Sequence, residues 1–185
     1  MELALTWNLV LLSLITLIFA FGFLLGQKST IKLILSTYIS MLTADGVADF
    51  FQKFVFEHLP GLQSLFYEIE IELFMWMRIG IFILSIIILV VKGGFHVNVG
   101  HHDHWIGRTI IHTVFSALAA FLMVATFLIY LSGNSFIEGI IYASQINIYQ
   151  ESLFAQLLID YYQAWFSLPA MSFLVASFFL DPTKD

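Results

Sequence analysis

The sequence predicts an all-α integral membrane protein with about four transmembrane helices and additional amphipathic or interfacial helices. Of the 185 residues, 60% are hydrophobic and only 11% are charged, whereas a soluble domain carries about a quarter charged residues. Residues 3–27 contain no charged side chain. A helix of that length, rising about 1.5 Å per residue, is long enough to cross a hydrocarbon core of about 30 Å. The chain is therefore interpreted as a single helical membrane domain over residues 1–185.

Apolar runs and the polar or glycine-containing turns between them divide the chain into elements. They predict crossing helices at about 4–26, 31–56, 73–91 and 106–131. The first is interpreted as a retained helix because Glu2 stands where a signal peptide would be basic, and because the run is too long for the apolar region of such a peptide. Residues 27–30 and 132–134 are expected to form turns.

The second helix changes character in its second half. Asp45, Asp49 and Lys53 recur every four residues and therefore share one helical face. Two interpretations remain open: the helix crosses the bilayer whole, or it bends into an amphipathic helix that lies at the membrane interface.

The C-terminal part predicts two further segments. Residues 152–165 have apolar side chains at helical spacing and predict an amphipathic helix. Residues 166–180 are apolar, but the segment is short for a crossing and Pro169 interrupts it. It could be re-entrant or lie on the surface, and the sequence leaves open whether it crosses.

Basic residues near the helix ends indicate an orientation. Lys28 and Lys32 lie in the first connection, and Lys92 and Arg108 flank the third. The positive-inside rule places these two connections in the cytoplasm, with both termini outside if four helices cross.

Four of the polar residues inside the predicted crossing helices are candidates for a polar intramembrane path: Asp45, Asp49, Arg78 and His112. Ionisable side chains are costly in a bilayer, so each is a candidate for function. Structural interpretations stand beside this one. Arg78 is close enough to its helix end to snorkel to the headgroups or to pair with Glu70 or Glu72. The aspartates could form the wet face of an interfacial helix, and His112 could be a packing residue.

Small residues indicate where helices approach closely. Gly22 and Gly26 form a Gly-x-x-x-Gly pattern, which lets two membrane helices come into contact. Ser116, Ala117 and Ala120 supply small side chains in the helix over 106–131. These residues are expected to support packing within a homo-oligomer or against another subunit of a membrane complex.

A histidine-rich loop precedes the helix over 106–131. His96 is followed by His101, His102, Asp103 and His104, and such a group could bind zinc, copper or nickel. The spacing is not that of an H-E-x-x-H metal helix, and a metalloenzyme would need further ligands and a sheltered cavity. A solvated interfacial loop and a pH-responsive loop are the alternatives.

Charge and composition exclude several classes. The net charge of −6 and the scattered basic residues argue against a nucleic-acid partner. The absence of cysteine excludes disulfides, iron–sulfur clusters and thiol chemistry. The chain has no nucleophile elbow, no Walker loop and no dinucleotide fingerprint. We therefore expect no enzymatic activity and no cofactor, with the lipid bilayer as the main surrounding partner.

The order of these features resembles that of the colicin V production protein family. The resemblance is carried by the paired glycines and basic residue of 22–28, by Trp105 to Arg108 at the start of a long helix, by the serine-containing stretch 151–156, and by Trp165 and Pro169. It covers about residues 5–170, although the first connection is less basic and the helix over 106–131 has fewer glycines than is usual in the family. The resemblance implies a non-enzymatic protein of the bacterial inner membrane, linked to colicin V export or production and to envelope homeostasis.

Three functional hypotheses follow. The first is a non-catalytic inner-membrane protein that acts as an oligomeric scaffold or as a pore-forming or export-associated subunit. The second is a small channel or transporter in which the four polar candidates face a wet path. The third is a membrane metalloenzyme that uses the loop from His96 to His104.

Overall fold

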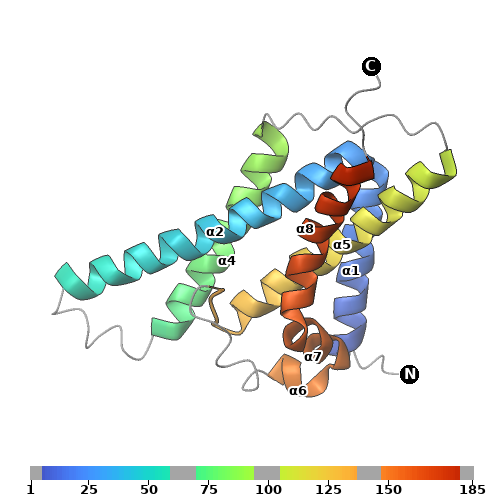
Figure 1. Cartoon of the computed structure of the whole chain (residues 1–185). Coiled ribbons are helices and arrows are strands. Elements are labelled where there is room, and N and C mark those ends of the chain that lie inside the picture. Colours follow the sequence, from blue (N-terminus) through green and yellow to red (C-terminus); the bar gives the residue numbers. More distant parts are fainter. Residues whose placement is uncertain (1–5, 59–69, 94–104, 137–146, 180–185) are drawn as a thin grey trace.

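The computed structural model describes residues 6–58, 70–93, 105–136 and 147–179, and this part of the chain is built from α-helices with no β-strand. The helices are α1 (Trp7–Leu25), α2 (Gln27–His58), α4 (Glu70–Lys92), α5 (Trp105–Leu131), α6 (Asn147–Glu151), α7 (Leu153–Asp160) and α8 (Tyr162–Phe179) (Figure 1). Within the described ranges, four of them, α1, α2, α4 and α5, are long and apolar enough to cross a membrane. The predicted fold class is therefore confirmed.

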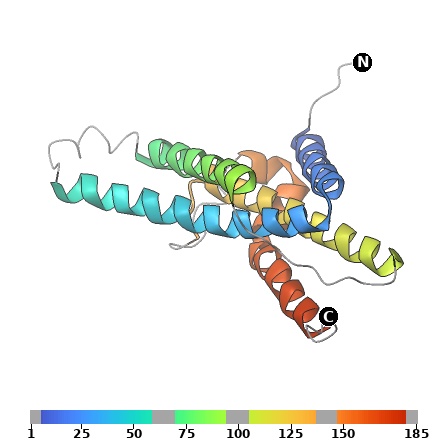
Figure 2. The ribbon, with the colours of Figure 1, turned by 90° about the horizontal axis from the view of Figure 1, so that it is seen from above.

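Helix α5 occupies the centre of the arrangement. It packs against α1, α2, α4, α7 and α8, and its buried side chains belong to both hydrophobic clusters of the protein. Helices α2 and α4 lie side by side and extend together beyond the other helices (Figure 2). The α2–α4 pair is therefore anchored to the rest of the protein mainly where it meets α5.

The connection between α1 and α2 is tighter than the sequence predicted. Residues 27–30 form the first turn of α2 and not a polar turn, so that prediction was wrong. Gly26 makes the reversal alone, at a φ of 85°, a conformation that only glycine adopts readily. Its carbonyl accepts a hydrogen bond from the Thr30 amide at 3.0 Å, which starts α2 at once.

Helix α2 continues without a break from Gln27 to His58, over 32 residues. The alternative in which its second half bends away as a separate interfacial helix is therefore wrong. At 1.5 Å per residue the helix is about 48 Å long, which exceeds a hydrocarbon core of about 30 Å. It runs steeply inclined to α1 (Figure 1), and such a tilt is the usual way for an overlong helix to fit a bilayer.

The predicted amphipathic helix over 152–165 is two elements. Ser152 caps the start of α7, because its hydroxyl accepts a hydrogen bond from the Ala155 amide at 3.1 Å. Helix α7 ends at Asp160, and α8 begins at Tyr162 and contains Pro169 in its interior. The proline therefore does not end the helix, which also packs on α5 through stacked rings of Phe173 and Phe115, 5.0 Å apart.

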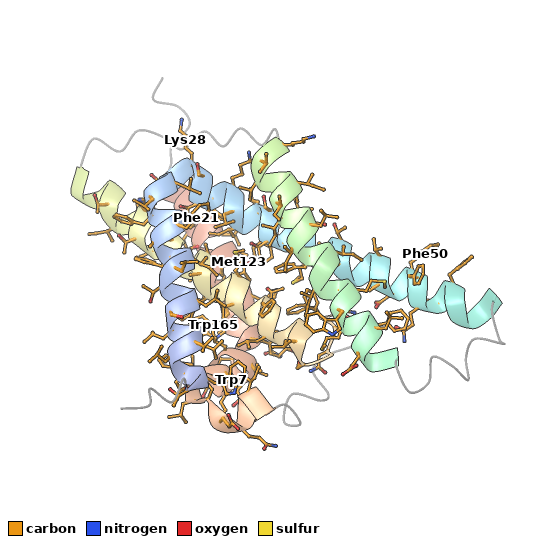
Figure 3. The ribbon with its side chains drawn as sticks, turned by 180° about the vertical axis from the view of Figure 1, so that it is seen from behind. Trp7, Phe21, Lys28, Phe50, Met123 and Trp165 are labelled. Carbon is orange, nitrogen blue, oxygen red and sulfur yellow. The ribbon has the colours of Figure 1, made fainter. Side chains whose placement is uncertain are left out.

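The two ends of the helical array differ. The α1–α2 connection near Lys28 lies at one end, together with the end of α4 and the start of α5 (Figure 3). Helices α6 and α7 lie at the opposite end, beside the start of α1 near Trp7. Helix α8 leads from α7 back toward the Lys28 end, antiparallel to α5. The helix ends that flank connections one and three therefore lie at the same end of the array, and the cytoplasmic location of these connections stays a prediction.

Polar contacts tie the elements of the Trp7 end together. The Ser152 hydroxyl donates to the Asn8 side-chain oxygen at 2.7 Å, which joins α7 to the first turn of α1. The Tyr149 hydroxyl donates to Asp160 Oδ1 at 2.9 Å, and this hydrogen bond raises the pKa of the partly buried Tyr149. Side chains therefore fix α6 and α7 against α1.

The outer surface is strongly apolar. Side chains such as Leu24, Phe50 and Val91 are more than two-thirds exposed although they are hydrophobic. Most of the apolar window of α1 and of α4 is likewise outside the protein interior. Large contiguous apolar surface is unusual on soluble monomers, so this exposure agrees with lipid as the surrounding solvent.

Candidate functional site: a buried charge cluster

Three charged side chains meet between α2 and α4. Arg78 Nη2 donates to Asp49 Oδ1 at 2.8 Å, and Arg78 Nε lies 3.8 Å from Asp45 Oδ1. We call Asp45, Asp49 and Arg78 the charge cluster. It lies inside the candidate spans of both helices. The structure therefore brings together three of the four polar intramembrane candidates named from the sequence.

Helical spacing explains how the cluster forms. Asp45 and Asp49 are one turn apart on α2, so a single side chain on a neighbouring helix can reach both. Arg78 stands near the start of the span of α4, and α4 packs along α2 at this point. The long guanidinium side chain then bridges the two carboxylates across the helix interface.

The three side chains of the charge cluster differ in how deeply they are buried. Asp45 is 1% exposed and the Arg78 side chain is 5% exposed, whereas 17% of the Asp49 side chain is accessible. Arg78 therefore does not snorkel outward, and its ion pairs reach the aspartates of α2. Asp45 is the innermost member, and Asp49 forms the edge of the cluster that reaches the surface.

Residues after and within α5 close the cluster on the side of Asp45. The Phe136 amide, in the turn that follows α5, donates to Asp45 Oδ2 at 3.0 Å. Tyr130 is fully buried, its hydroxyl donates to the Met41 carbonyl at 3.0 Å, and it interacts electrostatically with Asp45. Asp45 Oδ1 has no hydrogen-bond donor within the described ranges. Its contact with Arg78 Nε is longer than a hydrogen bond.

An aromatic wall borders this side of the cluster. The rings of Phe82 and Tyr130 meet edge to face at 5.5 Å, and those of Tyr130 and Phe136 at 5.7 Å. Phe166 from α8 lies 4.3 Å from Phe136, and its carbonyl accepts a hydrogen bond from the Tyr38 hydroxyl. Aromatic side chains from α4, α5 and α8 thus pack around Tyr130 and Phe136, the two residues within and after α5 that interact with Asp45.

Sequence reasoning missed Tyr130 and Phe136. Phe136 acts through its backbone amide, which carries no signature in a sequence. The available signal was the predicted turn at 132–134, which the structure confirms with Gly133 at a φ of 73°. That turn sends the chain back over the end of α5, and so it presents the next amides to α2.

The structure places His112 apart from the charge cluster. Its Nε2 lies 3.3 Å from the Gly22 carbonyl and 3.4 Å from the Thr30 hydroxyl, and its ring stacks on Phe23 at 4.9 Å. The Thr30 hydroxyl donates to the same Gly22 carbonyl at 2.7 Å. Thr30 precedes Asp45 by about 22 Å along α2. His112 therefore satisfies a carbonyl at the end of α1, where backbone acceptors lack helical partners.

Three of the predicted packing residues, Gly22, Ser116 and Ala120, lie between helices of the same chain. A Cβ atom at Gly22 would stand 3.6 Å from Ser116, so α1 and α5 meet here with little space between them. Ser116 and Ala120 are fully buried and Ala117 is partly buried. Gly26 serves the turn into α2 and has open space around it. The small residues therefore join α1 to α5 within the chain.

The predicted metal ligands cannot be placed. His96, His101, His102, Asp103 and His104 lie outside the described residues. Among the residues that the structure does describe, no group of three or more histidine, cysteine, aspartate or glutamate side chains could hold a metal ion.

The fold and the charge cluster define a small helical protein with four helices suited to crossing a membrane and a buried ionic site between two of them. No protein family, curated protein or solved structure matches this chain.

Proposed function

We propose that the protein is a small non-catalytic membrane transport protein, a channel or transporter, in which the charge cluster is the element that handles the transported ion. The observation that carries this proposal is the burial of Asp45 and Arg78 inside helices that are candidates to cross the bilayer. Intramembrane ionisable residues mark ion and substrate pathways in many membrane proteins.

The stabilising interpretation of the cluster is weaker. A buried ion pair gains little over well-packed apolar side chains, because removing both charges from water costs about as much as their attraction returns. Two carboxylates around one guanidinium are costlier still, since the second carboxylate lacks a full countercharge. If the charge cluster served only to hold α2 against α4, apolar core residues such as Phe82 and Ile86 would be sufficient for that role.

The scaffold hypothesis has less support. Gly22 and Ser116, which suggested packing between subunits, contact each other within one chain. Assembly into a homo-oligomer, a role as an export-associated subunit and a bacterial inner-membrane location remain proposals carried by the resemblance to colicin V production proteins. Measuring the mass of the protein extracted in mild detergent, with any co-purifying chains identified, tests them directly.

Ion flux in liposomes tests the transport proposal. Purified protein is reconstituted in liposomes with internal potassium chloride, and the release of ions, protons included, into a salt-free, osmotically balanced buffer is recorded. We expect wild-type protein to release ions faster than empty liposomes, and Arg78→Gln to change that rate at equal protein incorporation. Lys92→Gln is the matched control, because it removes one positive charge from the exposed end of the same helix. Equal rates for wild type, Arg78→Gln and empty liposomes would overturn the proposal.

A further inference from the structure

We propose that Asp45 is a reversible proton-binding site and, building on the proposed transport function, that the proton is the ion which the protein carries. The argument begins with a charge count. Two carboxylates and one guanidinium leave the charge cluster with one uncompensated negative charge when both aspartates are ionised. A net charge in a buried, apolar setting is strongly unfavourable, so such a site gains a compensating positive charge from its surroundings.

The geometry identifies which carboxylate remains uncompensated. Arg78 makes a short charge-assisted hydrogen bond to Asp49 at 2.8 Å, and its contact with Asp45 is 3.8 Å long. Asp45 Oδ2 accepts a hydrogen bond from the neutral Phe136 amide, the neutral Tyr130 hydroxyl also interacts with the carboxylate, and Oδ1 has no hydrogen-bond donor within the described part of the chain. Asp45 is also the member with the least exposure to water. The uncompensated charge therefore resides on Asp45.

A proton fits this place better than a metal cation does. Hard cations such as Ca²⁺ and Mg²⁺ are held by about six or more oxygen ligands. Around Asp45, the acidic oxygens in the described part come from two aspartates only, and the Arg78 guanidinium already lies between them. A proton needs a single oxygen and brings no coordination shell. Asp45 Oδ1 supplies that oxygen.

Proton binding leaves the rest of the cluster unchanged. The proton forms an O–H bond at Asp45 Oδ1, and Oδ2 continues to accept the hydrogen bond from the Phe136 amide. Arg78 and Asp49 remain as a neutral ion pair, so the net charge of the cluster rises from −1 to zero. When the proton leaves, Arg78 can turn toward the ionised Asp45, because its Nε already faces that carboxylate.

Within the described part of the chain, the groups that face Asp45 come from α2, α4, α5 and the turn after α5. They are Asp49 on α2 itself, Arg78 on α4, Tyr130 on α5, and the uncharged Phe136 amide after α5. Burial and Asp49 disfavour ionised Asp45, whereas the Phe136 amide, Arg78 and the Tyr130 hydroxyl favour it. The partly exposed Asp49 lies one turn from Asp45 and is the member of the charge cluster that connects it to the surface.

Chemical labelling of the wild-type protein tests the proton site without any substitution. Dicyclohexylcarbodiimide reacts with protonated carboxyl groups in apolar surroundings, and mass spectrometry locates the modified residue. We expect labelling at Asp45 in the full-length protein in detergent, falling about tenfold for each pH unit above the midpoint. Labelling that is absent at every pH, or independent of pH, would overturn the proposal. Protection by sodium chloride, but not by choline chloride, at constant pH would assign the site to a metal cation instead.

Infrared difference spectroscopy adds a matched pair of variants. Between about pH 5.5 and about pH 9, where exposed carboxyl groups are already ionised, wild-type protein should lose a carboxylic-acid C=O band and gain carboxylate bands. Asp45→Asn should abolish this pair of changes, whereas Asp49→Asn, which leaves Asp45 with Arg78 as a balanced pair, should move it to lower pH. A band that persists in a folded Asp45→Asn variant would overturn the assignment.

The labelling result also separates this inference from the transport proposal. Proton uptake by Asp45 in a protein that moves no ion across liposomes would support the proton site and remove the transport function. Ion flux without any titration of Asp45 would support transport and overturn the proton site.

Discussion

At the scale of single residues, Arg78 should contribute most to the stability of the charge cluster. Arg78→Gln would leave two carboxylates without a countercharge, one of them almost fully buried. Breaking a buried pair from one side costs about 3–5 kcal/mol, so we expect the free energy of unfolding in detergent to fall by about that amount. The double variant Asp49→Asn/Arg78→Gln should recover part of the loss, because it removes one of the stranded charges. A loss no larger than that of Lys92→Gln would contradict this interpretation.

Residue identity alone predicted part of the site. Charges within apolar runs stand out in any membrane sequence, and this made Asp45, Asp49, Arg78 and His112 candidates. Which of them meet depends on how distant helices pack, since Arg78 is 29 positions from Asp49 and the Phe136 amide is 91 positions from Asp45. For the same reason His112 could not be assigned to the end of α1 before the α1–α5 contact was known.

At the scale of the helices, the close approach of α1 and α5 depends on Gly22. A single methyl group there meets Ser116 at an ordinary contact distance of 3.6 Å, so Gly22→Ala should be tolerated. The larger side chain of Gly22→Leu must displace Ser116 or Thr30, and overpacking of this kind costs about 1–3 kcal/mol. Thermal unfolding in detergent measures the difference, and Gly46→Leu is the control because nothing lies near that position. A Gly22→Leu protein that unfolds normally but has a lower oligomer mass would instead support packing between subunits.

The helix boundaries show which features of the fold local sequence patterns predict and which they miss. Apolar length gave the crossing helices to within a few residues, because the bilayer fixes the length that a span requires. The polar composition of 27–30 suggested a turn, but Gly26 reverses the chain alone and leaves those residues free to be helical. The break at Tyr161 was missed for a related reason: the apolar spacing continues through it, and only the backbone departs from the helix.

At the scale of the whole molecule, the arrangement makes a prediction about sidedness. The chain has no cysteine, so single cysteines report accessibility without background. Lys28 and Lys92 lie at the end of the array where α1 meets α2 and α4 ends, whereas the exposed Tyr161 lies at the opposite end, between α7 and α8. A membrane-impermeant maleimide applied to sealed vesicles should therefore label Lys28→Cys and Lys92→Cys from one side and Tyr161→Cys from the other. The positive-inside rule adds that the lysine side is the cytoplasmic one. If Lys28→Cys and Tyr161→Cys were labelled from the same side, α1 could not cross the bilayer, and the charge cluster would have to be interpreted as an interfacial ion pair.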